Sequence, residues 1–191
     1  MTGTTTVASG SVAIWTVPLG APRSGFLSED DAARAARFLR EKDRIYWTHA
    51  RLALRSVLAG YTGQTPESLR FVCNENGKPA LVGAEIEFNL SHAGDFALIA
   101  VSRSRPVGID LERIRAEVDI AALLRRLGET DLPETIPELY QRWTRREARS
   151  KAAGGQLFVM PPEDIEAFDI EGPKGYAAAV AVRSGKAVVR R

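Results

Sequence analysis

The distribution of apolar positions divides the chain into short strands and a few helices. Residues 12–17 (VAIWTV) are β-branched and aromatic and stop at Pro18, which predicts a first strand. A helical pattern starts at Ser28, where three acidic residues follow a capping serine. The helical patterns predict helices at 28–60, broken near Asp43, at 118–127 and at 136–153.

Short apolar runs separated by turn residues predict the remaining strands. These runs lie at 69–73, 80–82, 86–90, 96–102, 107–111, 165–169, 176–182 and 186–190. Turns are expected at Asn76-Gly77, Ala93-Gly94 and Arg105-Pro106. Because strands and helices recur in each half, we predict an α+β fold of two similar subdomains, residues 1–104 and 105–191.

Composition limits the class of protein. The chain has 191 residues, 45% of them hydrophobic, which is enough for a buried core. Cys73 is the single cysteine, so no internal disulfide can form, and we expect Cys73 to be buried and a cytoplasmic location. The first twenty residues lack a secretory pattern, and no apolar run approaches the roughly 20 residues of a membrane-spanning helix.

The charge is balanced in total and segregated along the chain. A formal net charge of +2 argues against a general nucleic-acid binder. Arginines concentrate at 34–55 and 142–149, whereas carboxylates concentrate at 110–119 and 129–138. A cationic pocket for a small polyanion beside a carboxylate metal site fits this segregation, and so do solvated helix faces.

Two carboxylates share one face of the predicted strand at 107–111. Side chains alternate along a strand, so Asp110 and Glu112 project to one side while Ile109 and Leu111 enter the core. Paired hard oxygen ligands suit Mg²⁺, which takes a few carboxylates and completes its shell with water and phosphate. A solvated strand edge is the alternative reading of this pair.

A second group of polar residues lies on the helix predicted at 136–153. Trp143, Glu147 and Lys151 stand four residues apart and therefore share one stripe of the helix. An ordinary surface pair of glutamate and lysine is the alternative. Trp143 at the head of the stripe favours a buried face.

Two further segments carry groups suited to phosphate. Ser91 and His92 are expected at a strand end, where both can donate hydrogen bonds, although a histidine in this place is commonly structural. Lys78 lies in a turn and is followed by the rigid Pro79, which by itself indicates only a hairpin tip.

In this order and spacing, the segments resemble the 4'-phosphopantetheinyl transferase superfamily. They are Gly77-Lys78-Pro79, Asn89-Leu90-Ser91-His92, Gly108-Ile109-Asp110-Leu111-Glu112 and Trp143 with Arg146-Glu147-Ala148 and Lys151. The chain looks most like the monomeric two-subdomain, surfactin-synthetase-activating type. The resemblance implies two pseudo-symmetric halves with coenzyme A between them, and transfer of its phosphopantetheine arm to a serine of an acyl or peptidyl carrier protein.

The resemblance also implies roles for single residues. Asp110, Glu112 and Glu147 are the expected Mg²⁺ ligands, and Glu147, Lys151 and Asp110 the expected catalytic residues. Coenzyme A is expected to contact Lys78, Ser91, His92 and Lys151, together with Arg44 or Arg51 at its 3'-phosphate. Either Glu147 or a metal-bound water is the general base.

Two features of the sequence and one rival function leave alternatives open. Arg146 stands where the family has lysine, and the two side chains are not interchangeable at a defined contact. The stretch between Glu112 and Trp143, where the carrier is expected to dock, is short, so the carrier range stays undetermined. A non-catalytic module that binds coenzyme A or a carrier protein is the rival function.

Overall fold

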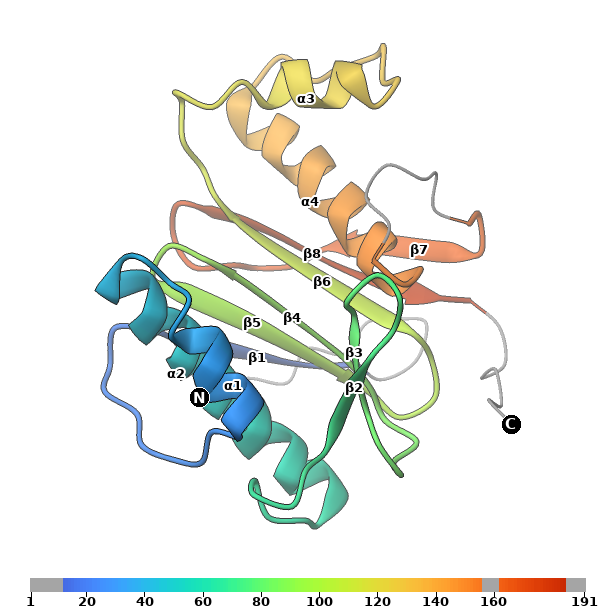
Figure 1. The fold of residues 1–191 in the computed structure, drawn as a ribbon. Helices are drawn as coiled ribbons and strands as arrows, with labels where there is room; N and C mark the ends of the chain where they lie inside the picture. Colours follow the sequence, from blue (N-terminus) through green and yellow to red (C-terminus); the bar gives the residue numbers. More distant parts are fainter. Residues whose placement is uncertain (1–11, 156–161, 185–191) are drawn as a thin grey trace.

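Two three-stranded antiparallel sheets form the centre of the molecule (Figure 1). The structure is a computed structural model that describes residues 12–155 and 162–184. Within these residues it contains four helices, and a two-stranded hairpin lies beside the two sheets. The predicted α+β class is confirmed. The predicted strand at 186–190 lies outside the described residues.

The first sheet has the order β1-β5-β4. It consists of β1 (Val12–Pro18), β4 (Glu87–Ala93) and β5 (Phe96–Ser102), and α2 (Glu41–Thr62) covers one face. The apolar stripe of α2 packs on alternate residues of these strands. Buried side chains in this layer include Val17, Leu54, Leu58, Phe88, Ile99 and Val101.

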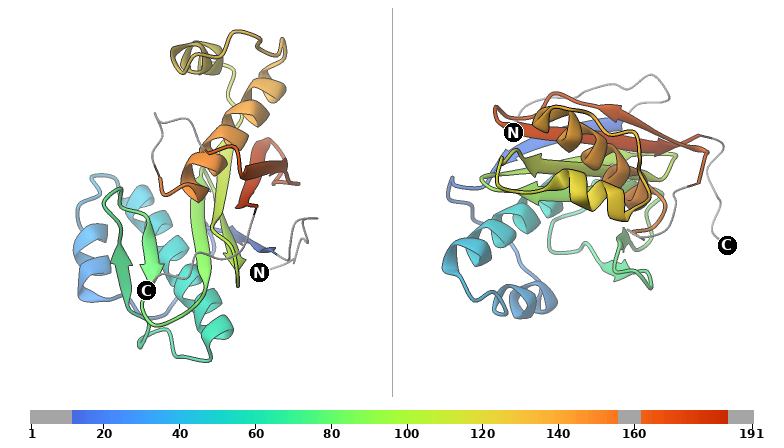
Figure 2. Two further views of the ribbon diagram at one scale, coloured as in Figure 1. Left: turned by 90° about the vertical axis from the view of Figure 1, so that its right-hand side faces the viewer. Right: turned by 90° about the horizontal axis from the view of Figure 1, so that it is seen from above.

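The second sheet has the order β6-β8-β7 and carries its own helix. It consists of β6 (Val107–Arg113), β7 (Ile165–Asp169) and β8 (Tyr176–Arg183), covered by α4 (Ile136–Ala152). The short α3 (Ile120–Arg126) packs against α4 at one end of the molecule (Figure 2). The division into subdomains 1–104 and 105–191 stays a prediction.

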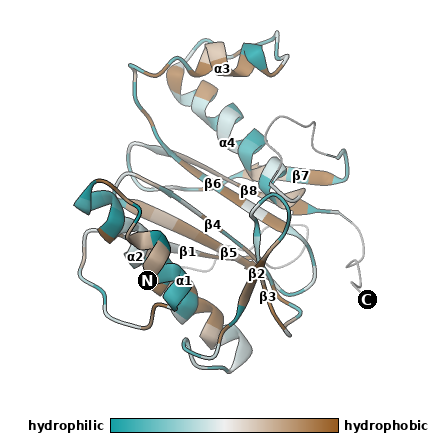
Figure 3. Ribbon diagram, viewed as in Figure 1, coloured by the Kyte–Doolittle hydropathy of each residue, from teal (hydrophilic) through white to brown (hydrophobic). Residues whose placement is uncertain are grey.

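The two sheets also pack against each other, which explains why their central strands are apolar along their whole length. Leu98 and Ala100 of β5 share a buried cluster with Ile109 of β6 and Val180 of β8. A strand buried on both faces has no polar positions to alternate with apolar ones. Figure 3 accordingly shows hydrophobic colour along the inner strands and hydrophilic colour on α1 and the start of α2.

The predicted break in the first helical stretch was misplaced. The first helix, α1 (Glu29–Ala35), starts after the capping Ser28, and α2 begins at Glu41 behind an extended Arg40, so the break lies at 36–40 and not near Asp43. The earlier turn lets α1 fold back along α2.

Asp31 of α1 binds two arginines of α2 and so holds the two helices together. Its carboxylate accepts hydrogen bonds from Arg51 Nε at 2.7 Å and from Arg55 Nη2 at 2.8 Å. Arg55 is 2% exposed and also donates to the carbonyls of Pro66 and Leu69. This buried ion pair joins both helices to the loop that follows α2.

The hairpin of β2 (Phe71–Cys73) and β3 (Pro79–Leu81) turns at Gly77, which has a φ of 79°. The turn was predicted correctly, but the prediction that Cys73 is buried was wrong. Cys73 is exposed, because the hairpin pairs with neither of the two central sheets. No helix within the described ranges is long and apolar enough to cross a membrane.

Candidate active site in the seam between the sheets

Helix α4 crosses β6 at Gly108, and this crossing positions the functional groups of both elements. A Cβ atom on Gly108 would lie 2.0 Å from the carbonyl oxygen of Ala148 and 2.5 Å from the backbone nitrogen of Ala152. Only glycine therefore allows the two backbones to come so close. The contact brings Glu147 and Lys151, on either side of Ala148, toward the strand that carries Asp110.

Gly108→Ala is therefore expected to destabilise the fold by about 1–3 kcal/mol, the usual cost of forcing extra atoms into a packed interior. The free energy of unfolding in urea measures the effect. Gly60→Ala is the matched control, because Gly60 lies within α2 and has nothing within 4 Å of an added Cβ. Alanine there should be neutral or stabilising. Equal stability of the two variants would contradict the tight crossing.

Asp110, Ser91 and Lys151 form a hydrogen-bonded cluster beneath the crossing. Lys151 Nζ lies 2.5 Å from Asp110 Oδ1 and 3.1 Å from Ser91 Oγ. Ser91 in turn donates to Asp110 Oδ1 at 3.0 Å. Asp110 is 3% exposed, so its charge is balanced by Lys151 rather than by water.

Glu112 and Glu147 lie near enough to Asp110 for its charge to affect the pKa of both carboxyls. Burial and then the charge of Asp110 raise the pKa of Glu147 to about 7. Burial and then the charge of Asp110 also raise the pKa of Glu112. A hydrogen bond from Trp143 lowers the pKa of Glu112, but this effect is smaller than the rise caused by burial and by Asp110. The hydrogen bond links Trp143, the first residue of the helical stripe, to strand β6. The sequence spacing thus predicted that Trp143 and Glu147 share a helix face, and the fold places this face against the strand that carries Glu112.

Two of these carboxylates each have an oxygen that could still bind a cation. Asp110 Oδ2 and Glu147 Oε1 are buried and have no hydrogen-bond partner among the described residues. Buried carboxylate oxygens without donors are costly, and a hard divalent cation would satisfy them. Across residues 12–155 and 162–184, however, no three His, Cys, Asp or Glu side chains are already gathered into a metal site. The donor chemistry suits a cation, and coordination would require the carboxylates to draw closer.

A cavity of about 240 Å³ lies between α1, α2, the β2–β3 hairpin and β4. Two of the predicted coenzyme A contacts, Arg51 and His92, line it. The other lining residues are Asp31, Arg34, Trp47, Leu54, Cys73, Gly77, Pro79, Asn89 and Leu90. Lys78, between Gly77 and Pro79, donates from Nζ to the carbonyl of Val107 at 3.1 Å. Its amine thus reaches β6.

Only one of the two arginines predicted to contact the 3'-phosphate, Arg44 and Arg51, lies at this cavity. Arg44 is exposed and pairs with Glu41 on the same helix, outside the cavity lining. Arg51 lines the cavity and is held by Asp31. Sequence reasoning missed Arg34 and Trp47, although Trp47 stands four residues before Arg51 and therefore on the same helical face.

The surroundings of His92 lower its pKa and so favour the neutral imidazole. Desolvation by the surrounding protein lowers its pKa, and the charge of Lys151 lowers it further, while Asp43 raises it by less. A neutral imidazole carries one N–H donor. His92 can therefore donate a hydrogen bond to a phosphate oxygen without being protonated.

Arg146, at the position where the family has lysine, is used for a structural contact. Its Nη1 lies 3.4 Å from Glu129 Oε1, and Arg142 Nη1 lies 3.4 Å from Glu129 Oε2. Arg146 is 11% exposed at its side chain. Glu129 thus binds the connection between α3 and α4 to the outer turns of α4.

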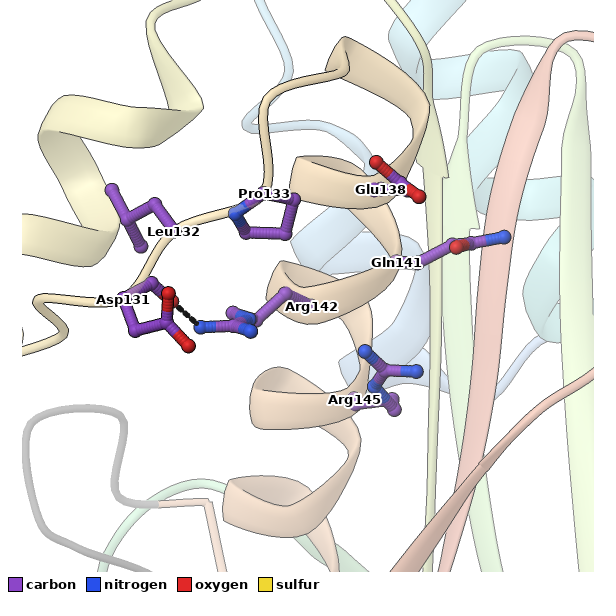
Figure 4. A pocket seen from close by; sticks show the side chains of 7 residues that line it. All are labelled: Asp131, Leu132, Pro133, Glu138, Gln141, Arg142 and Arg145. Atoms are coloured by element: carbon purple, nitrogen blue, oxygen red, sulfur yellow. Dashed lines mark hydrogen bonds between the residues drawn. The ribbon is translucent and has the colours of Figure 1, made fainter.

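A second hollow, of about 380 Å³, lies on the outer side of α4 (Figure 4). The figure shows Leu132 and Pro133 of the connection facing the helix, with Arg142 hydrogen-bonded to the backbone of Asp131. None of the predicted site residues lines this hollow. It is separate from the carboxylate cluster.

Comparisons with known proteins agree with these motifs. The family model described as "4'-phosphopantetheinyl transferase, N-terminal" matches residues 23–104. The chain is 37% identical to the 4'-phosphopantetheinyl transferase HetI of Nostoc sp., over 84% of the chain and 75% of the relative. It is 37% identical to AcpT of Salmonella typhimurium over 59% of the chain and 62% of the relative. It is 24% identical to Sfp of Bacillus subtilis over 69% of the chain and 62% of the relative.

Proposed function

The chain belongs to the 4'-phosphopantetheinyl transferase family, and we propose that it transfers the phosphopantetheine arm of coenzyme A to a carrier-protein serine in a Mg²⁺-dependent reaction. The observation that carries this proposal is the cluster of Asp110, Glu112 and Glu147 with Lys151, next to a cavity lined by cationic groups. The carrier belongs to lipid, polyketide or nonribosomal-peptide assembly. The protein acts as a cytoplasmic monomer.

The nucleotide end of coenzyme A occupies the cavity between α2 and β4. Arg51, with Arg34 beside it, supplies positive charge for the 3'-phosphate, because both line the cavity. His92 donates to a phosphate oxygen, and Lys78 lies near the nucleotide on the hairpin turn. The diphosphate then extends toward Lys151 and the carboxylates.

Side chains of the chain can neutralise the charge on the leaving group and accept the proton of the carrier serine. The serine oxygen of the carrier attacks the β-phosphate, the bond to the leaving 3',5'-ADP breaks, and the serine proton must be accepted. Lys151 neutralises the negative charge that develops on the 5'-phosphate of the departing 3',5'-ADP. Glu147, or a water beside it, is the candidate to accept this proton.

Mg²⁺ would be held by Asp110, Glu112 and Glu147. When bound, it supplies positive charge that lowers the repulsion between the attacking oxygen and the phosphates. Asp110 Oδ2 and Glu147 Oε1 support this assignment, because both are buried without a partner among the described residues. Asp110 Oδ1 stays engaged with Lys151.

Intact mass spectrometry of a panel of apo-carrier proteins tests the function. After incubation with the protein, Mg²⁺ and coenzyme A, a substrate carrier should gain the mass of one phosphopantetheine group. An excess of chelator should prevent the gain. A protein that binds coenzyme A but modifies no carrier would be the rival binding module, and unchanged turnover in chelator would remove the metal from the reaction.

His92→Ala is expected to raise the KM for coenzyme A about tenfold, because a hydrogen bond to a charged phosphate contributes roughly 1.5–3 kcal/mol. The contact exists in the ground state, so kcat should change little. Arg44→Ala is the comparison, since Arg44 lies outside the cavity lining and should leave KM unchanged. If kcat alone fell in His92→Ala, His92 would belong to proton transfer instead.

A further inference from the structure

The hairpin of β2 and β3 is anchored differently at its base and at its tip. At the base, Phe71 and Leu81 pack into the core beneath the first sheet, and the ring of Phe71 meets that of Phe88 at 5.8 Å. At the tip, residues 72–77 are exposed, and the hairpin pairs with neither central sheet. Apolar packing therefore fixes the base, whereas the tip depends on polar contacts.

Asn74 organises the turn at the tip with its side-chain oxygen. Its Oδ1 accepts hydrogen bonds from the backbone N–H groups of Asn76 at 3.0 Å and of Lys78 at 2.8 Å. The backbone carbonyl of Asn74 also accepts from the N–H of Gly77 at 3.0 Å. Because two N–H groups point at one end of the side-chain amide, that end must be the oxygen, and the Nδ2 donor must face the other way.

The Nδ2 group of Asn74 reaches the end of α4, 80 residues away in the sequence. It donates to the backbone carbonyl of Gly154 at 3.0 Å. Gly154 and Gly155 follow α4 with φ values of 118° and 96°, which favour glycine, and the N–H of Gly155 returns to the carbonyl of Ser150 at 2.8 Å. This left-handed turn leaves the carbonyl of Gly154 free to face the hairpin.

The bond from Asn74 joins one wall of the cavity to the helix that carries the candidate catalytic residues. Cys73, Gly77 and Pro79 of the hairpin line the cavity. Gly154 lies three residues after Lys151. The bond uses none of the groups proposed to bind Mg²⁺ or phosphate, so the binding of either does not require it to break.

We propose that Asn74 is a positioning residue that holds the hairpin against the end of α4 and so retains coenzyme A in the cavity. This inference rests on the proposed function, because it takes the nucleotide end of coenzyme A as the occupant of the cavity. Without the bond, the exposed tip can move away from α4, and coenzyme A dissociates faster. Transfer from coenzyme A that is already bound is unaffected, because Asn74 bonds to the turn and to Gly154 and not to a reacting group.

Asn74→Asp tests this bond selectively. Aspartate keeps the oxygen that accepts from Asn76 and Lys78, so the turn can still form, but it has no N–H to donate to Gly154. We expect the Kd for coenzyme A, measured by isothermal titration without a carrier, to rise about three- to tenfold, the range of one net hydrogen bond. The kcat at saturating coenzyme A should stay within about twofold.

Asn76→Asp is the matched control for the added charge. It puts the same negative charge on the same exposed tip and leaves the bond from Asn74 to Gly154 in place, so its Kd should change clearly less. Asn74→Ser adds no charge and is too short to reach Gly154, so its Kd should rise as in Asn74→Asp. Hydrogen exchange of the hairpin amides, measured without coenzyme A, should be faster in both Asn74 variants than in Asn76→Asp.

Three results would each overturn the role of Asn74. They are an equal Kd in Asn74→Asp and Asn76→Asp, a rise in Kd confined to the charged variants, and an unchanged Kd with a lower kcat. The proposed function would fail differently, because then the unaltered protein would bind coenzyme A and modify no carrier.

Discussion

Replacement of Glu147 by glutamine is expected to slow carrier modification by on the order of 10² or more, the scale of a positioned acid or base. Glutamine keeps the shape of the side chain and removes both its charge and its basicity. Burial and the charge of Asp110 raise the pKa of Glu147 to about 7 when no cation is bound, so its environment differs from that of a solvated carboxylate. The same change removes one proposed oxygen ligand from the carboxylate cluster.

The measurement is single-turnover carrier modification by purified Glu147→Gln, with folding matched to the unaltered protein by circular dichroism. Lys151→Ala should also slow transfer, because we propose that Lys151 neutralises charge on the leaving group. Arg145→Ala is the control on the same helix, since Arg145 makes a surface pair with Asp169 at 2.8 Å. Transfer by Glu147→Gln at the normal rate would refute the catalytic role of Glu147.

Asp31→Asn is expected to destabilise the protein by about 3–5 kcal/mol, the cost of breaking one side of a buried ion pair. Asp31 is 5% exposed and Arg55 is 2% exposed, so neither charge can turn to water. Asparagine would leave the guanidinium of Arg55 buried without an anion. Because Arg51 shares this carboxylate, the wall of the cavity that Arg51 lines would loosen as well.

The same pair predicts how stability depends on pH. Burial raises the pKa of Asp31, but Arg51 and Arg55 together lower it by more, so its pKa in the folded protein lies below the ordinary value. The contribution of Asp31 is therefore present above the pKa of the unfolded chain. It is lost as the pH falls through the folded pKa, because protonation removes the anion.

Urea unfolding monitored by circular dichroism at pH 7 and at acidic pH measures both effects. Asp169→Asn is the matched control, because Asp169 pairs with Arg145 at a position where both side chains are about 40% exposed. Exposed pairs contribute only about 0–1 kcal/mol. A similar cost for the two variants would show that the Asp31 pair is not buried in solution. Asp31→Asn should also reduce the loss of stability in acid.

The sequence by itself determined the α+β class, most strands and the candidate active-site residues. Apolar runs at β5 and β8 and the helical stripe of α4 are local patterns, so they are legible without tertiary information. The spacing of Glu147 and Lys151 placed both on one stripe for the same reason. Alternation along β6 likewise placed Asp110 and Glu112 together.

Only the tertiary structure decided the partners of these residues. The close crossing at Gly108, the exposure of Cys73 and the choice of Arg51 over Arg44 at the cavity depend on elements distant in the sequence. The position of the helix break follows from Asp31 meeting arginines about twenty residues away. The motif of Ser91 shows its hydroxyl but not the groups that the fold places around it, Asp110, the backbone of Leu111 and Lys151. Periodicity fixes which way a side chain points within its own element, whereas contacts between elements depend on packing.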